Sequence, residues 1–198
     1  MSARVGLDRQ TIVAAAAEIA DLNGLDSVTL AAVADRLGVR KPSLYNHVNG
    51  LPELRELLAI WGTHQLRAKI SEAAIGKAKH DAILAIANAY RSFAHQRPGL
   101  YRAILSSPNR DNLELKAAIE NMMTVISKVL EPYNLVSSDN THAVRGLRSL
   151  MHGFVSLEAA GWFAAPVDRE ESYRRLINTF IHGIDSSSGL DVLPLQPD

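Results

Sequence analysis

Side chains that can contact nucleic acid follow one another closely in the first quarter of this sequence. Arg40 and Lys41 can donate hydrogen bonds to the guanine acceptors in the major groove of DNA, and Ser43 comes shortly after them. Tyr45 and His47 can donate hydrogen bonds to phosphate oxygens. The pattern predicts that one short segment both reads base edges and holds the DNA backbone.

The sequence around this segment predicts two short helices joined by a tight turn. Ser27 or Thr29 can cap the first helix, and Gly38 can adopt the left-handed conformation that the turn needs. Pro42 suits the first turn of the second helix. In a helix-turn-helix the second helix enters the major groove while the first crosses the backbone, so we expect Thr29 to contact phosphate too. Arg4 and Arg9 are expected to form an N-terminal arm along the backbone.

Helical periodicity dominates the rest of the chain, and alternating strand patterns of useful length are missing. Asp8 can cap the first helix and Gly24 can end it. These signals predict an all-α fold with a small N-terminal three-helix domain and a larger helical part after it. The expected helices cover about residues 8–23, 29–37, 41–48, 52 to beyond 66, 81–96, 99–106, 112–131, 138–165 and 168–186.

Composition excludes several classes of protein. The 21 basic and 21 acidic residues cancel, so any binding to DNA must come from local segregation of charge, with a modest dependence on salt. The chain has no cysteine, which excludes disulfides and thiolate metal sites and favours a reducing compartment. No apolar run approaches the roughly 18 residues of a membrane helix. We therefore expect a soluble, cytoplasmic protein without membrane contact.

Two other classes of function compete with DNA binding. The first is an enzyme, but zinc-protease, phosphate-loop and nucleophile-elbow motifs are missing, and Asp139-x-x-His142 is the nearest approach to a di-iron pattern. We expect no catalytic residue, no metal and no cofactor. The second is a helical binding protein that keeps the helix-turn-helix without using it. Replacing Tyr45 with Phe and His47 with Ala should separate that class from a DNA-binding protein.

The stretch from Thr29 to Val48 resembles the DNA-binding domain of the tetracycline-repressor (TetR) family of bacterial regulators. The shared pattern is Thr29-Leu30, Val33-Ala34, Leu37-Gly38-Val39, Ser43-Leu44-Tyr45-Asn46-His47-Val48 and a leucine-rich fourth helix from Leu51 to Leu58. The resemblance implies a two-domain, all-helical homodimer, usually a repressor, that binds a palindromic operator in double-stranded DNA. A small-molecule effector in the C-terminal domain would move the fourth helix and release the DNA.

Carried over by position, the resemblance makes residues 40–47 the recognition helix, with Tyr45 and His47 on phosphates. The predicted DNA-binding residues are Thr29, Arg40, Lys41, Pro42, Ser43, Tyr45, Asn46 and His47. Arg40 stands where many members have a capping serine, and Leu51 where many have a phosphate-binding lysine. The implied domains are a helix-turn-helix domain at residues 1–50, a ligand-binding and dimerisation domain at 51–186, and a flexible tail at 187–198.

The C-terminal part resembles the subgroup named for a Trp-His-Gly (WHG) motif, with Met151-His152-Gly153 at that position. Periodicity places Leu147, Met151, Phe154, Glu158 and Trp162 on one stripe of a helix. Glu158 either pairs with an arginine or caps a helix end, or it faces a ligand. His152 is interpreted as a structural histidine. The predicted ligand pocket comprises Trp61, Tyr90, Phe93, Tyr101, Met122, Met151, Phe154, Glu158 and Trp162, which would suit an aromatic or apolar compound.

Small residues recur along the same predicted helix. Gly146, Gly153 and Ala160 stand seven residues apart and form a smooth ridge that another helix can approach closely. The ridge suits either a seam between two copies of the chain or a crossing within one copy. A second copy is also expected because one recognition helix reads few bases, whereas a two-fold pair reads two half-sites about one helical turn apart.

Overall fold

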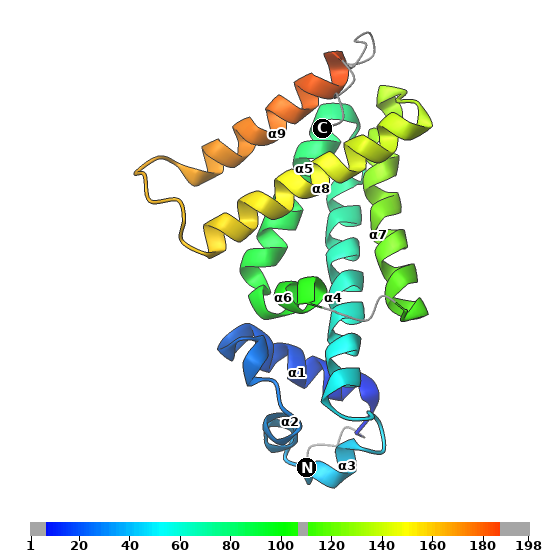
Figure 1. Ribbon diagram of the computed structural model, residues 1–198, viewed down its shortest axis with the longest axis vertical. Coiled ribbons are helices and arrows are strands. Elements are labelled where there is room, and N and C mark those ends of the chain that lie inside the picture. The colour runs from blue at the N-terminus through cyan, green and yellow to red at the C-terminus, as the bar shows by residue number, and fades with distance from the viewer. Residues whose placement is uncertain (1–6, 107–110, 187–198) are drawn as a thin grey trace, which may run out of the picture. The chain divides into compact units, whose positions relative to one another are not determined.

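The computed structural model describes residues 7–106 and 111–186. The predicted tail at 187–198 and the predicted contact of Arg4 lie outside the described residues. Every regular element within these ranges is a helix, which confirms the all-α prediction (Figure 1). No helix among them is both long and apolar enough to cross a membrane. The elements are α1 (Arg9–Asn23), η1 (Leu25–Ser27), α2 (Leu30–Leu37), α3 (Lys41–Leu44), α4 (Leu51–Ala74), α5 (Lys79–Gln96), α6 (Pro98–Ser106), α7 (Leu113–Leu130), η2 (Glu131–Tyr133), α8 (Ser137–Ala159) and α9 (Arg169–Ser186).

The first two helices begin and end at the predicted residues. Asp8 caps α1, because its carboxylate accepts a 2.7 Å hydrogen bond from the backbone N–H of Thr11, and Gly24 ends the helix with φ of +85°. This bond is the main cause that lowers the pKa of Asp8 below its ordinary value. Of the two predicted caps for α2, Thr29 takes the position and accepts from Ala32 N at 3.1 Å. Ser27 belongs to η1 instead.

The chain divides into two compact units. The N-terminal unit comprises Met1–Ala68 and Ser92–Met122, and the C-terminal unit comprises Lys69–Arg91 and Met123–Asp198. Helices α4, α5 and α7 therefore contribute residues to both units. These units are defined by packing, and the functional boundary expected at residue 50 stays a prediction.

In the N-terminal unit α1 is the central element, because α2 and α6 both pack against it (Figure 1). Its small and β-branched side chains allow this close packing, and Ile12 and Ala16 are fully buried. The closest approach is at Gly99 of α6. A Cβ atom added there would lie 2.0 Å from the carbonyl carbon of Ala20, so only glycine fits.

In the C-terminal unit α8 packs against α9 (Figure 1). An added Cβ at Gly146 would meet the Phe180 ring of α9 at 3.4 Å, so this end of the predicted ridge serves a crossing within the chain. An added Cβ at Gly153 would meet nothing within 4 Å. The buried residues of α9 recur at helical spacing and so form one face of the helix; they are Tyr173, Ile177, Ile181 and Ile184.

The end of α8 corrects the predicted helix. The sequence predicted a helix that reaches residue 165, but α8 ends at Ala159. The N–H of Gly161 donates to the carbonyl of Glu158 and the N–H of Trp162 donates to that of Leu157, which is the Schellman pattern, with Gly161 at φ +75°. Trp162 therefore lies beyond the helix and not on the predicted stripe, and the residue is 74% exposed.

Candidate functional site

The turn between α2 and α3 is closed by the same kind of motif. The N–H of Gly38 donates to Asp35 and the N–H of Val39 donates to Ala34, while Gly38 has φ of +64° and ψ of +30°. The predicted left-handed glycine is confirmed. Since α2 also packs against α3, this motif sets the angle at which the second helix of the pair projects.

The recognition segment, residues 40–47, is shorter as a helix than the resemblance implied. Its α-helical part covers Lys41–Leu44, and residues 45–47 continue as a turn. Arg40 occupies the N-cap position without a side-chain hydrogen bond, as expected when arginine replaces a capping serine. Buried Leu44 and Val48 hold the segment to the unit.

The predicted DNA-binding side chains lie on the outer face of this segment. Tyr45 is 52% exposed, and Ser43 and His47 are half-buried. Within residues 7–106 and 111–186, no carboxylate forms a salt bridge with Arg40 or Lys41. The segment therefore presents two cations without a local counter-charge. The exposed members of the predicted set are Thr29, Arg40, Lys41, Pro42, Tyr45 and Asn46.

A brace formed by Arg9 and Glu53 fixes the end of the recognition segment. Arg9 Nε donates to the carbonyl of His47 at 3.2 Å, and its guanidinium lies 3.4 Å from the Glu53 carboxylate. Glu53 also accepts a hydrogen bond from the backbone N–H of Asn49. Arg9 was predicted in an N-terminal arm, and that prediction is wrong, because Arg9 is the first residue of α1 and is used inside the unit.

Most acidic side chains of the helix-turn-helix region are paired with arginines. Glu18 accepts from Arg36 Nε at 2.9 Å, and Asp26 lies 3.2 Å from Arg102. The pairing leaves the positive charge of Arg40 and Lys41 less opposed, which is how a neutral domain can still attract DNA.

Asp21 joins α1 to the start of α6. Its carboxylate accepts from Arg97 and also from the backbone N–H of Leu100 at 3.0 Å, so it caps α6 from another helix. The Arg97 guanidinium also lies 5.4 Å from the centre of the Trp61 ring. Movement of α6 would therefore act directly on α1, against which the helix-turn-helix packs.

The C-terminal unit contains a largely buried charged cluster made of Arg91, Phe154, Glu158 and Tyr173. Arg91 donates two hydrogen bonds to Glu158, from Nε at 2.9 Å and from the terminal nitrogen at 2.7 Å. The Glu158 hydrogen bonds raise the pKa of Arg91. The same guanidinium lies 5.8 Å from the Phe154 ring and 5.4 Å from the Tyr173 ring. Of the two alternatives for Glu158, the structure shows the pairing with an arginine.

Tyr173 anchors this cluster to α5. Its hydroxyl donates to the carbonyl of Ala87 at 2.8 Å, and burial raises its pKa. His152 lies nearby on α8, where its Nδ1 is 3.3 Å from the Ser156 hydroxyl. Burial and the neighbouring Arg148 lower the pKa of His152, and its interpretation as a structural histidine stays a prediction.

The predicted pocket residues are distributed over both units. Trp61, Phe93, Tyr101 and Met122 belong to the N-terminal unit, and Tyr90, Met151, Phe154, Glu158 and Trp162 belong to the C-terminal unit. Most are buried, but Trp162 lines a shallow pocket at the α8–α9 connection together with Phe154 and Phe163. That they form one ligand site stays a prediction. Sequence reasoning missed Arg91, which carries no local signal because its partner lies 67 residues away.

The part of the chain that the structure describes holds no group of three or more His, Asp or Glu side chains arranged to bind a metal ion. This statement covers Asp139 and His142, the nearest approach to a metal motif in the sequence.

Comparisons with known proteins cover nearly the whole chain. A family model described as "Bacterial regulatory proteins, tetR family" matches residues 12–47, and one described as "Tetracyclin repressor-like, C-terminal domain" matches residues 83–180. The uncharacterized HTH-type transcriptional regulator YobS of Bacillus subtilis is 39% identical over 185 residues, which cover 93% of this chain and 96% of YobS. An uncharacterized regulator of the same type from Mycobacterium tuberculosis is 38% identical over 156 residues, 78% of this chain and 72% of the relative.

Solved structures share the fold. A protein of unknown function from Rhodococcus sp. RHA1 superposes with a TM-score of 0.78 at 21% identity, covering 90% of this chain and 95% of that one. A TetR variant from Acinetobacter baumannii, solved in complex with minocycline, gives 0.70 at 21% identity, covering 93% and 100%.

Proposed function

This chain belongs to the tetR family of bacterial regulatory proteins and is a helix-turn-helix transcriptional regulator rather than an enzyme; we propose that it is a repressor that binds a palindromic operator as a dimer and is released by a small molecule. The observation that carries the proposal is the recognition segment, whose exposed Arg40 and Lys41 have no ion-pair partner among the described residues. Because operator DNA lies in the bacterial cytoplasm, the protein works there.

The side chains divide between two tasks at the DNA. Arg40 and Lys41 stand at the N-terminal end of the segment, the end that meets base edges in this motif. Tyr45 and His47 stand at its other end and bind phosphates, with Thr29 contacting the backbone from the start of α2. Pro42, Ser43 and Asn46 complete the contact surface. The Arg9–Glu53 brace positions His47 and adds no contact of its own to the DNA.

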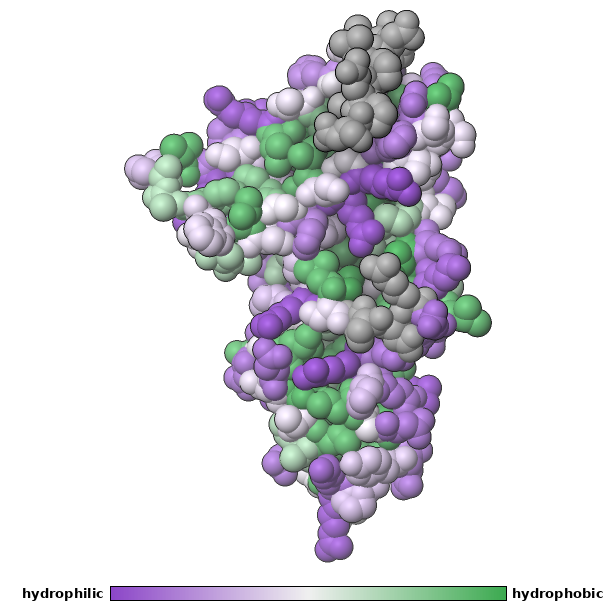
Figure 2. Space-filling view, in the orientation of Figure 1, coloured by the Kyte–Doolittle hydropathy of each residue, from purple (hydrophilic) through white to green (hydrophobic). Residues whose placement is uncertain are grey.

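Dimer formation is supported by the open surface of α8 and α9. Added Cβ atoms at Gly153 and Gly183 would meet nothing within 4 Å, so both helices can accept another helix at close range. Apolar side chains gather over the connection between α8 and α9 (Figure 2), and Leu157 and Val167 are 47% and 64% exposed. Leu157→Arg should convert the dimer to a monomer in analytical ultracentrifugation without unfolding it. An unchanged sedimentation coefficient would contradict this seam.

The effector is proposed to bind among the predicted pocket residues. Aromatic and methionine side chains favour an aromatic or apolar compound, and Glu158 is already paired with Arg91. The chain has two tryptophans, Trp61 and Trp162, so binding should change intrinsic fluorescence. Trp162 is the strongly exposed member of the predicted set, so we propose that the effector binds nearer Trp61 than Trp162. We expect Trp61→Phe to abolish that change and Trp162→Phe to keep it. The opposite result would move the site to the α8–α9 connection. The Trp-His-Gly subgroup stays a prediction that names no ligand.

Selection of bound fragments from random duplex DNA by the purified protein tests the central proposal. We expect enrichment of a palindromic site with half-sites about one helical turn apart. On that site Arg40→Met should cost about 1–3 kcal/mol and relax specificity at one base position. Lys116→Met, which removes an exposed lysine of α7, is the matched control and should change little.

The phosphate contacts have their own test. The double change Tyr45→Phe with His47→Ala should weaken binding to all sequences alike. Operator affinity that survives this double change would contradict the assignment of contacts. The operator proposal as a whole would be contradicted if the wild-type protein bound DNA only weakly and without sequence preference, and if salt abolished that binding.

A further inference from the structure

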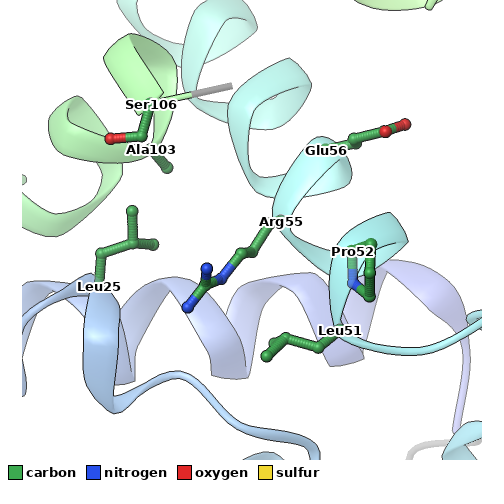
Figure 3. Close-up of a pocket in the computed structure, with 7 residues that line it drawn as sticks. All are labelled: Leu25, Leu51, Pro52, Arg55, Glu56, Ala103 and Ser106. Atoms are coloured by element: carbon green, nitrogen blue, oxygen red, sulfur yellow. The ribbon is translucent and has the colours of Figure 1, made fainter. Parts of the chain in front are cut away.

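A small pocket opens in the N-terminal unit, and none of the predicted DNA-binding or effector-binding residues lines it (Figure 3). We call it the head pocket; its volume is about 270 Å³. It lies between η1, the first two turns of α4 and the end of α6. Most of its wall is apolar, with Leu25, Leu51, Pro52 and Ala103.

One solvent-exposed cation lines the head pocket. The Arg55 side chain extends from α4 into the space between Leu25 and Leu51 (Figure 3). Across the two described ranges, Arg55 has neither a salt bridge nor a side-chain hydrogen bond. The other charged lining residue, Glu56, points away from Arg55 in Figure 3 and accepts a 2.8 Å hydrogen bond from Asn112. The pocket therefore combines apolar walls with an uncompensated positive charge.

We propose that the head pocket binds a small organic anion, a carboxylate carried on a short apolar body. A guanidinium presents a planar pair of donors that matches a carboxylate, and such pairs are bidentate and strong. The apolar wall would contact the apolar body of the ligand. Inorganic phosphate has no such body and could not make this contact. The volume of about 270 Å³ lies just below the range of about 300–1,000 Å³ that is usual for ligand pockets, which limits the body to a few carbon atoms or one ring.

The position of the head pocket couples it to the DNA-reading segment. Leu25 precedes α2, and Leu51 and Pro52 follow the recognition segment, so an occupant contacts both flanks of the helix-turn-helix. The Arg9–Glu53 brace ties the same turn of α4 to the carbonyl of His47. A bound anion also neutralises Arg55 and thereby weakens the attraction of this unit for DNA. Occupancy should lower DNA affinity, and DNA should lower anion affinity by the same factor. This coupling rests on the proposed function, whereas the binding of the anion does not.

The test uses the full chain without DNA, with benzoate and hexanoate as probes and benzamide and hexanamide as neutral partners. We expect at least one carboxylate to bind with a dissociation constant of about 1 mM in a calorimetric or NMR titration, and its amide at least about tenfold more weakly. Arg55→Met, which keeps the apolar stem, should lose the binding, and so should Ser106→Phe, which fills the rim of the pocket. Arg67→Met removes an exposed arginine further along α4 and is the matched control.

Several outcomes would overturn the site. The site is refuted if the carboxylate and its amide bind with equal affinity, or if the carboxylate binds wild type and Arg55→Met with equal affinity. It is also refuted if neither carboxylate binds at a concentration 20-fold above the expected dissociation constant. If Arg55→Met instead weakens DNA binding and neither carboxylate binds, Arg55 belongs to the DNA contact surface and the site is refuted. Binding that leaves the affinity for the selected operator unchanged keeps the site and refutes the coupling. If no operator is selected, the titration without DNA still decides the site.

Discussion

The Arg91–Glu158 pair allows a double-mutant cycle whose result follows from its burial. The Glu158 side chain is 8% exposed and that of Arg91 is 17% exposed. Removing one partner of a buried pair costs about 3–5 kcal/mol, because the other charge stays buried without a partner. The rings of Phe154 and Tyr173 would still stabilise the cation of Arg91 after the Glu158 carboxylate is removed, which lowers the cost of that change. We therefore expect Arg91→Met to cost about 3 kcal/mol and Glu158→Leu about 2 kcal/mol.

Replacing both partners together should lower the free energy of unfolding by less than the sum of the two single losses. Methionine and leucine fill similar volumes and leave no buried charge, so the double variant should lose about 2 kcal/mol, which corresponds to a coupling energy of about 3 kcal/mol. For a chain of this length each kcal/mol lowers Tm by about 2–4 °C. Arg91→Met should therefore lower Tm by about 6–12 °C, and the double variant by about 4–8 °C.

Circular dichroism during heating and during urea titration at pH 7 measures all three variants. Losses below about 1 kcal/mol for both single changes, or strict additivity, would refute the structural role of the pair. Additivity together with loss of the response to an effector would restore the alternative in which Glu158 faces the ligand.

Two further predictions concern backbone space and pH. Gly99→Ala should lower the free energy of unfolding by about 3 kcal/mol, because its Cβ would overlap the backbone of Ala20. Urea unfolding measures the loss, and a value below about 1 kcal/mol would contradict the close contact. Hydrogen bonds from Arg174 and from its neighbour lower the pKa of Glu171 from 4.5 to about 2. Its contribution to stability is therefore fully present above about pH 4.5 and is lost as the pH falls towards 2. An NMR titration should find this pKa raised in Arg174→Gln; an unchanged value would refute the cause.

Much of the local architecture could be predicted because helix signals act over a few residues. Asp8 and Thr29 cap helices through N–H groups three residues further on, and Gly38 turns the chain where its lack of a Cβ permits positive φ. Gly161 carried the same kind of signal, but the apolar spacing that continues to Trp162 favoured a longer helix. The structure shows that the local stop prevailed over the periodicity.

The candidate site was predictable only in part, because some of its residues have partners that are distant in the sequence. The exposed face of the recognition segment follows from sequence, since Leu44 and Val48 must be buried and the residues between them face outward. The role of Arg9 does not follow, because its partners stand 38 and 44 positions away and no local pattern connects them. The same holds for Asp21, whose partners are Arg97, between α5 and α6, and Leu100 of α6.

The sequence by itself determined the ends of α1 and α2, the helix-turn-helix and the outward cations Arg40 and Lys41, because capping, turn geometry and amphipathic spacing are properties of neighbouring residues. Only the tertiary structure decided that Arg9 braces the recognition segment, that Arg91 pairs with Glu158 and that Arg55 faces an apolar pocket without a counter-charge. A charged side chain takes the partner that folding brings within hydrogen-bonding reach. That partner is set by the packing of distant helices and not by the residues beside it in the chain.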